Sequence, residues 1–259
     1  MRKIFSLFVL AVLVSASQAC ALSEKDHDLK AHDCTKCHTL KIEEAAAILK
    51  DVAPDVKILN IAQGPVKGLW EVFLQAGGRK AVVYVDYSKK NFFSGAVIDI
   101  KGKKNLTQEK FDELNKVDVS KIPLDDALVL GDKGAKYKVI VFSDPDCPYC
   151  GKLHQELKKV IEKRKDIAFF IKLFPLPMHP DAGWKAKSII CKKSMKLLED
   201  NFEGKQIPKE ECDSKAIEEN TKIAGEAGIS GTPALVLPDG RIVPGYREAD
   251  ALIELITKK

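Results

Sequence analysis

The sequence predicts an α/β protein with two folded domains. The chain has 259 residues, more than one domain of ordinary size requires. Residues 42–105 combine one helical pattern with several segments rich in β-strand residues. Residues 138–259 follow the order β-α-β, then a helical stretch, then β-β-α. This order is that of a thioredoxin fold with a helical insertion, preceded here by a small α+β domain.

Residues 1–21 have the pattern of a signal peptide. A basic start, MRK, precedes a mostly apolar run over residues 4–14, and small residues follow. The run is shorter than the roughly 20 residues that cross a bilayer. We expect cleavage after Ala19 or Ala21 and export to a bacterial periplasm. Lipid attachment at Cys20 is the less favoured alternative, because an aliphatic residue usually stands three positions before a lipid-modified cysteine.

The net charge argues against a nucleic-acid partner. The formal charge of the chain is +5, and loss of Arg2 and Lys3 with the signal peptide reduces it to +3. A charge this small, spread evenly along the chain, does not form the basic surface that nucleic-acid binding requires. We therefore expect no nucleic-acid partner.

The cysteines form three close pairs. The chain has seven cysteines, and cleavage after Ala21 removes Cys20 and leaves six. Cysteines of an exported protein are normally paired, modified or catalytic, because the compartment is oxidising. The pairs are Cys34 with Cys37, Cys147 with Cys150, and Cys191 with Cys212.

Residues 22–41 form a polar segment that carries the first cysteine pair, and residues 42–105 form the predicted N-terminal domain. A helical pattern begins at Ile42 and ends before Pro54. The β-rich segments that follow cover residues 56–62, 69–76, 80–87 and 92–100, with a hairpin turn predicted at Gly77-Gly78. A small antiparallel sheet has exposed edges that must be covered or paired, so we expect self-association.

Residues 106–137 are predicted to be a linker helix and a connector. The stretch 107–117 has the pattern of a short helix with Thr107 as its N-cap. The catalytic domain is predicted over residues 138–259. Its elements are a strand at 138–144, an amphipathic helix after residue 147, a strand at 167–174, a mostly helical stretch at 180–228, strands at 234–238 and 241–245, and a helix at 248–258.

Cys147 and Cys150 are the predicted catalytic pair. The sequence FSDPDCPYCGKLH places Cys147 between an apolar strand and the first turn of an amphipathic helix. The free N–H groups and the dipole of a helix start stabilise a thiolate, so we expect Cys147 to attack and the more shielded Cys150 to resolve. A disulfide across two residues would add little stability. A zinc site would need a second pair about 15–20 residues away.

Three stretches together resemble the DsbC/DsbG family of periplasmic disulfide isomerases. They are FSDPDCPYCGKLH, GISGTPALVLPDGRIVPGY and the cysteine pair between them. The resemblance implies a cystatin-like N-terminal dimerisation domain and a homodimer. It also implies that a loop with Pro233 in the cis form faces the catalytic cysteines, so that the backbone of Thr232 pairs with extended substrates. A structural disulfide between Cys191 and Cys212 is implied as well; such a bridge would add about 3 kcal/mol of stability.

The resemblance further implies a reaction and its partners. Cys147 would attack a disulfide of a misfolded exported protein. A substrate thiol could then displace Cys147, which is isomerisation, or Cys150 could do so, which is reduction. A membrane thiol reductase of the DsbD type would keep the pair reduced. We therefore predict a periplasmic thiol–disulfide oxidoreductase with chaperone capacity; a holdase chaperone whose binding cleft matters more than its cysteines is one alternative.

The first cysteine pair has a different pattern. Cys34-Thr35-Lys36-Cys37-His38 fits the C-x-x-C-H motif of covalent haem c attachment. Cys34 and Cys37 would form the thioethers, and His38 would bind the haem iron. The familiar DsbC and DsbG proteins lack this motif, so the resemblance does not bear on it. The sequence favours haem; a surface disulfide, an accessory redox pair and another metal are the alternatives. A second function follows, that of a c-type cytochrome with a thioredoxin-like redox module.

Two histidines near the second cysteine pair receive no functional role from the sequence. His154 follows Cys150 on the same helix, and we expect it to be solvated. His179, in the stretch PMHPD, is expected to be an ordinary loop residue.

Overall fold

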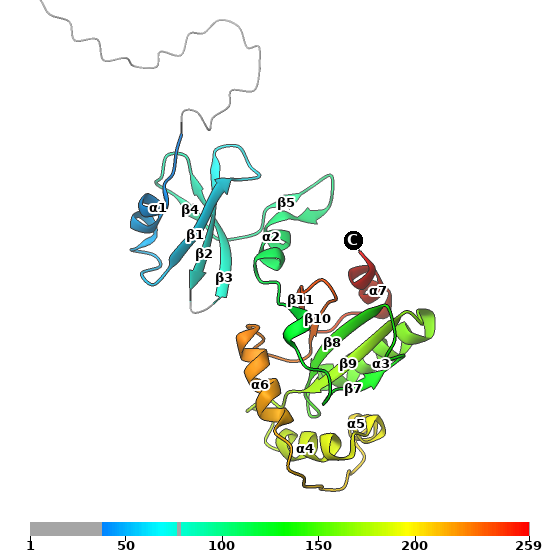
Figure 1. The fold of residues 1–259 in the computed structure, drawn as a ribbon. Coiled ribbons are helices and arrows are strands. Elements are labelled where there is room, and N and C mark those ends of the chain that lie inside the picture. Colours follow the sequence, from blue (N-terminus) through cyan, green and yellow to red (C-terminus); the bar gives the residue numbers. More distant parts are fainter. Residues whose placement is uncertain (1–37, 77–78, 259) are drawn as a thin grey trace, which may run out of the picture. The chain divides into compact units, whose positions relative to one another are not determined.

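The computed structural model describes residues 38–76 and 79–258 (Figure 1). The predicted signal peptide over residues 1–21, Cys20, Cys34 and Cys37 lie outside the described residues. The described chain holds a four-stranded sheet, a two-stranded ribbon and a five-stranded sheet. Within these residues, no helix combines the length and the apolar character that a membrane crossing requires.

The N-terminal domain starts with a helix and continues as an antiparallel sheet. Its elements are α1 (Ile42–Leu49), β1 (Lys57–Gln63), β2 (Leu69–Ala76), β3 (Arg79–Asp86) and β4 (Phe92–Phe93), with the strands in the order β1-β2-β3-β4. A ribbon of β5 (Ile98–Asp99) and β6 (Lys104–Asn105) leads into helix α2 (Leu106–Leu114). The segment predicted as one strand over 92–100 is therefore two short strands, separated by a bend at Gly95.

Both faces of this sheet are covered, because the side chains of β2 and β3 alternate between them. Residues of one face pack with α1; they are Trp70, Val72, Leu74, Val83 and Val85, against Ala45 and Leu49. Residues of the other face pack with the end of α2; they are Phe73, Val82 and Tyr84, against Leu114. The two strands are therefore buried on both sides.

Helix α2 is capped by a different residue from the one that the sequence suggested. The side chain of Asn105 accepts a hydrogen bond from the backbone N–H of Gln108 at 2.9 Å. Thr107 lies inside the helix; its Oγ1 accepts from the Val97 N–H at 2.9 Å and lies 2.6 Å from Tyr84 Oη. The prediction of Thr107 as the cap was wrong because Asn105 caps equally well two residues earlier.

The C-terminal domain is built on a five-stranded mixed sheet in the order β11-β10-β8-β9-β7. The strands are β7 (Leu128–Leu130), β8 (Tyr137–Ser143), β9 (Ile167–Leu173), β10 (Ala234–Val236) and β11 (Ile242–Pro244). The helices are α3 (Pro148–Lys163), α4 (Ala182–Lys192), α5 (Met195–Phe202), α6 (Ala216–Glu226) and α7 (Ala249–Thr257). Strands β8 and β9 are parallel and joined by α3, whereas the other strand pairs are antiparallel.

Helices and the connector cover the two faces of this sheet. On one face, Val139, Val141 and Phe169 share a core with α3, α7 and the insertion helices α4 and α5. On the other face, Ile140 and Phe142 share a core with α6 and the connector. Strands β8 and β9 are thus buried on both sides, which explains their nearly unbroken apolar sequence.

The segment predicted as a connector contributes to this sheet. A 3₁₀ turn at Val119–Lys121 and strand β7 lie within it, and β7 pairs antiparallel with β9. The sheet therefore begins before residue 138, the predicted start of the catalytic domain. A strand of three residues is too short to show a period of two in the sequence.

A buried ion pair attaches the connector to β9. Lys172 is 1 % exposed, and its ammonium contacts the carboxylate of Asp126 and lies 2.7 Å from the carbonyl oxygen of Pro123. A buried ammonium without partners would be costly, so these two contacts fix where the connector crosses the sheet. Alternation along β9 places Ala168, Phe170 and Lys172 on this face.

Cys191, near the end of α4, is bonded to Cys212 with an S–S distance of 1.96 Å and a Cα–Cα distance of 5.7 Å. The bridged residues are 21 apart in the chain. The bridge encloses α5 and most of residues 205–215, which have no regular secondary structure. It therefore restrains the part of the insertion that has the least backbone hydrogen bonding.

We expect the double variant Cys191→Ser, Cys212→Ser to unfold with a free energy about 3 kcal/mol below that of the oxidised wild type, because the unfolded chain regains the entropy of the open loop. Urea titration followed by circular dichroism measures this difference. Wild type in excess dithiothreitol is the control and should match the variant. Equal urea midpoints for variant and oxidised wild type would contradict the prediction.

Candidate active site

Strand β8 places the second cysteine pair at the start of helix α3. The strand ends at Ser143, and Asp144, Pro145 and Asp146 lead into the helix. Cys147 is the N-cap residue with an extended backbone, and Pro148 occupies the first turn. Proline is tolerated there because the first N–H groups of a helix have no intrahelical partner. The N–H groups of Cys150 and Gly151 donate to the Cys147 carbonyl oxygen at 3.0 and 3.3 Å. The positive end of the helix dipole therefore lies beside Cys147.

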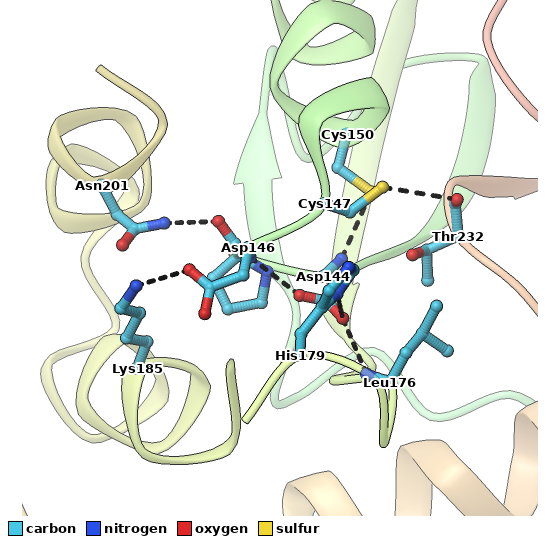
Figure 2. A network of polar contacts seen from close by, with 10 residues as sticks. Asp144, Asp146, Cys147, Cys150, Leu176, His179, Lys185, Asn201 and Thr232 are labelled. Carbon is cyan, nitrogen blue, oxygen red and sulfur yellow. Dashed lines mark hydrogen bonds and ion pairs between the residues drawn. The ribbon is translucent and has the colours of Figure 1, made fainter. Parts of the chain in front are cut away.

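The two sulfur atoms differ in their surroundings (Figure 2). Cys147 is 7 % exposed and Cys150 is 2 % exposed, and both are free thiols. Cys147 Sγ lies 3.5 Å from the carbonyl oxygen of Thr232, and Cys150 Sγ accepts from the N–H of Asp144 at 3.4 Å. Burial raises the pKa of Cys150 to about 12, although the Asp144 N–H opposes this rise. Cys150 is therefore a thiol at neutral pH.

The loop before β10 faces Cys147. The Thr232–Pro233 peptide bond is cis, and Thr232 contributes the carbonyl oxygen closest to the sulfur. Among the described residues, the N–H of Thr232 makes no hydrogen bond. The backbone of Thr232 therefore offers one donor to an incoming chain beside the reactive sulfur.

Asp144 is the centre of the polar network behind the cysteines. The residue is 0 % exposed. Its Oδ1 accepts from the Asp146 N–H at 2.8 Å, and its Oδ2 accepts from the Leu176 N–H at 2.7 Å and from His179 Nδ1 at 2.8 Å. These three donors satisfy the hydrogen-bonding needs of a carboxyl group that is closed to water. The network joins the turn before Cys147 to the loop after β9.

The insertion helices hold the same turn from another side. Lys185 Nζ of α4 lies 2.5 Å from Asp146 Oδ1, and Asn201 Nδ2 of α5 donates to the Pro145 carbonyl oxygen at 2.5 Å. In Figure 2, these two side chains and Thr232 lie on opposite sides of the cysteine pair. Between α3 and the insertion, a groove of about 590 Å³ reaches Cys147; its lining includes Gly151, Lys152, Lys185 and Phe202.

Comparisons with known proteins identify the family. A model of the thioredoxin-like domain matches residues 124–259, and one of the N-terminal domain of disulfide bond isomerase proteins matches residues 38–108. The thiol:disulfide interchange protein DsbC of Salmonella typhimurium is 30% identical over 210 residues, which cover 78% of this chain and 82% of that protein. This chain belongs to the DsbC family.

A second curated relative agrees with this assignment. A probable DsbC of Bordetella avium is 29% identical over 206 residues, covering 79% of this chain and 70% of that protein. Among solved structures, a disulfide interchange protein from Neisseria gonorrhoeae is 34% identical, with a TM-score of 0.46, and the match covers 53% of this chain and 97% of that chain.

Membership in the DsbC family confirms two predictions. The fold class is a thioredoxin-like domain preceded by a small α+β domain, as the element order indicated. The protein is an enzyme, a thiol–disulfide oxidoreductase. Thiol–disulfide exchange is a reaction between sulfur atoms, and DsbC-type proteins need no cofactor for it.

The C-x-x-C-H motif lies beyond these comparisons. The match to the DsbC N-terminal domain begins at residue 38, and the structure does not describe Cys34 and Cys37. His38 is described; it is exposed, and its ring centroid lies 4.9 Å from that of Tyr87. Over residues 38–258, apart from 77–78, no three metal-ligating side chains gather as a metal site would require. Neither the family nor the described site supports haem.

His154 is buried, so the expectation that it is solvated was wrong. It is 2 % exposed, its Nε2 lies 3.1 Å from Glu199 Oε1, and its ring centroid lies 5.6 Å from that of Phe202. Burial lowers the pKa of His154, and this effect outweighs the opposite effect of Glu199. Helix α5 covers this side of α3, and the pattern of α3 alone does not reveal what the insertion covers.

We expect His154 to make the fold less stable in mild acid. Its pKa is lower in the folded protein than the roughly 6.5 of an unfolded chain, so the unfolded state binds more protons as the pH falls below that value. The loss is at most about 1.4 kcal/mol per pH unit for one proton. Urea titrations at pH 7.5 and 5.5 measure it. His154→Gln, which keeps a donor toward Glu199, should show a smaller difference between the two pH values; an equal difference would contradict the prediction.

Sequence reasoning missed most of the network behind the cysteines. Asp144 could have been predicted as a site residue, because an aspartate at the end of an apolar strand is expected to be buried and to need hydrogen-bond donors. Nothing in the sequence pairs it with His179, which follows 35 residues later. The contacts of Lys185 and Asn201 could not be predicted either, because they depend on how the insertion helices pack against the turn before Cys147.

Proposed function

We propose that the protein is a periplasmic enzyme that isomerises or reduces non-native disulfides of exported proteins at Cys147 and Cys150. The asymmetry of the pair carries this proposal. Cys147 is the more accessible sulfur, lies at a helix start and faces Thr232. Cys150 is buried and has a pKa raised to about 12. Such a pair suits one attacking and one resolving sulfur.

The reaction begins when the Cys147 thiolate attacks a substrate disulfide. A bond forms between Cys147 and one substrate sulfur, and the other substrate sulfur leaves as a thiolate. In isomerisation, a substrate thiolate then attacks the mixed disulfide, and Cys147 leaves again as a thiolate. In reduction, Cys150 loses its proton to solvent and displaces the substrate, so that both enzyme cysteines are oxidised. A membrane reductase of the DsbD type would return them to the dithiol.

Substrate binding is assigned to the backbone of Thr232 and to exposed apolar side chains. The free N–H of Thr232 can pair with an extended chain without reading its sequence. Tyr149 is 59 % exposed and Met178 is 76 % exposed, and both belong to segments that carry site residues. Large exposed apolar groups suit a protein that binds unfolded chains, and they support the proposed chaperone capacity.

The proposed assembly is a homodimer formed through the N-terminal domain. In the described residues, β1 pairs with β2 alone and so has one free edge. The same domain exposes large apolar residues after β3; they are Phe92, Phe93, Ile98 and Ile100. Sedimentation equilibrium tests the proposal, and a monomer at micromolar concentration would contradict it.

Refolding of scrambled ribonuclease tests the enzymatic proposal. Wild type in a glutathione buffer should restore ribonuclease activity, and the variant Cys147→Ala, Cys150→Ala should not exceed the buffer alone. Equal rescue by both proteins would contradict thiol chemistry. If the variant instead prevents aggregation of a reduced substrate as well as wild type does, the binding function is independent of the cysteines.

Covalent haem at Cys34 and Cys37, with His38 as iron ligand, is a separate prediction that rests on the motif alone. We expect the exported protein to carry one haem, which mass spectrometry of the intact chain measures as an added mass. A Cys34→Ser, Cys37→Ser variant should lack both this mass and the Soret absorption. An exported wild-type chain without added mass would contradict the prediction and, with it, the cytochrome function.

A further inference from the structure

His179 is the one side chain in the described parts of the chain that hydrogen-bonds to the carboxylate of Asp144; the other donors are backbone groups. The carboxylate is fully buried, whereas the side chain of His179 is 23 % exposed. Oδ2 also accepts from the Leu176 N–H, so we take it as the acceptor here and His179 Nδ1 as the donor. The pair thus extends from the protein surface to the region behind the cysteines.

Asp144 connects this pair to the resolving cysteine. Its own backbone N–H donates to Cys150 Sγ at 3.4 Å, and that donation favours the thiolate of Cys150. The sulfur of Cys147 faces Thr232 instead; the link from Cys147 to Asp144 is a backbone hydrogen bond of 3.2 Å. Figure 2 shows the two branches leaving the cysteine pair, one to Thr232 and one through Asp144 to His179 and Leu176.

The carboxylate of Asp144 fixes the direction in which its N–H points. Oδ1 is held by the Asp146 N–H, and Oδ2 is shared between Leu176 and His179. Loss of the histidine would leave Oδ2 with one donor in a site closed to water, a change that favours movement of the carboxylate. Such a movement weakens the alignment of the Asp144 N–H with Cys150.

We propose that His179 is a positioning residue for the resolving step of the reaction. It holds the carboxylate of Asp144 so that the Asp144 N–H points at Cys150 and stabilises the developing thiolate. In that step the Cys150 thiol releases its proton to solvent, the Cys147–Cys150 bond forms, and the Cys147–substrate bond breaks. The substrate sulfur leaves as a thiolate and takes a proton from solvent. This inference rests on the proposed function, because the resolving step by Cys150 is the reduction route of the proposed reaction.

Two variants distinguish the effect of the hydrogen bond to Asp144 from the effect of the imidazole ring itself. His179→Ala removes the donor to Asp144. His179→Asn retains a donor near the position of Nδ1 and cannot become charged. The substrate is a peptide disulfide with a fluorescent leaving group. Rapid acid quench and mass spectrometry follow the formation and the decay of the mixed disulfide with Cys147 at pH 7.

We expect His179→Ala to slow the decay about 3- to 10-fold, the effect of one hydrogen bond, while formation of the mixed disulfide changes less than about 2-fold. His179→Asn should restore the decay rate to within about 2-fold of wild type. Thermal unfolding of each variant records any general loss of stability.

Three results would overturn the inference: an unchanged decay rate in His179→Ala, an equal loss of both rates, or an Asn variant as slow as the Ala variant. Failure of the proposed function looks different. In that case wild type itself forms no mixed disulfide at Cys147, and no decay can be followed.

Discussion

We expect the replacement of Cys147 by alanine to abolish disulfide exchange, whereas the replacement of Cys150 should leave Cys147 in a mixed disulfide with the substrate. Cys147 lies at the start of α3 beside Thr232, and Cys150 is buried beneath it with a pKa raised to about 12. Without Cys147, the remaining described cysteine of the site is Cys150, which is buried and protonated. We expect the rate of exchange to fall by a factor on the order of 10³ or more, as it does when other covalent enzymes lose their nucleophile.

The Cys150→Ala variant should retain the first step and lose the second. Its Cys147 attacks as before, but no enzyme thiol can displace the substrate, so the mixed disulfide accumulates until a substrate or glutathione thiol removes it. Non-reducing electrophoresis after rapid alkylation measures this adduct. The Cys147→Ala variant is the matched control and should show none.

The roles of the two cysteines would be reversed if Cys147→Ala retained exchange and formed an adduct through Cys150. The disulfide between Cys191 and Cys212 serves as an internal reference, because both variants should keep it. Each variant is alkylated without dithiothreitol and mapped by peptide mass spectrometry. Among Cys147, Cys150, Cys191 and Cys212, one alkylated cysteine per chain verifies this.

The parts of this structure that depend on neighbouring residues could be predicted from the sequence. Strand β8, the helix start at Cys147 and the turn into α3 follow from an apolar run, a proline and an amphipathic pattern that adjoin one another. The same holds for the β2–β3 hairpin, because two β-rich segments adjoin Gly77-Gly78 and pair in one unbroken register from Leu69 opposite Asp86 to Ala76 opposite Arg79.

What sequence reasoning missed depends on contacts between distant segments. His154 was expected to be solvated because α5, which covers it, follows more than 40 residues later: the pair His154–Glu199 is separated by 45 positions. His179 and Asp144 meet because the loop after β9 returns beside the end of β8. Strand β7 was missed for another reason. Its three residues are too few to show a periodic pattern, and they form a strand because they pair with β9.

The largest effect on stability is expected at Lys172, which no sequence pattern singled out. Its ammonium is 1 % exposed and has two partners, the Asp126 carboxylate and the Pro123 carbonyl oxygen. Removal of one partner of a buried pair leaves an uncompensated charge and typically costs about 3–5 kcal/mol. We therefore expect Asp126→Ala to lower the free energy of unfolding by about that amount, measured by urea titration at pH 7.

The two partners should not be equivalent. Asp126 is 19 % exposed at its side chain, so after Lys172→Met its carboxylate can turn toward water, and the loss should be smaller than for Asp126→Ala. The double variant Lys172→Met, Asp126→Ala contains no buried charge here, and we expect it to be more stable than Asp126→Ala alone. A double-mutant cycle over the four proteins measures the coupling. Two results would contradict this role of the ion pair: a loss of less than about 1 kcal/mol in Asp126→Ala, or a double variant that is the least stable of the four proteins. In either case the apolar contacts of Phe170 and its neighbours would hold the connector on β9.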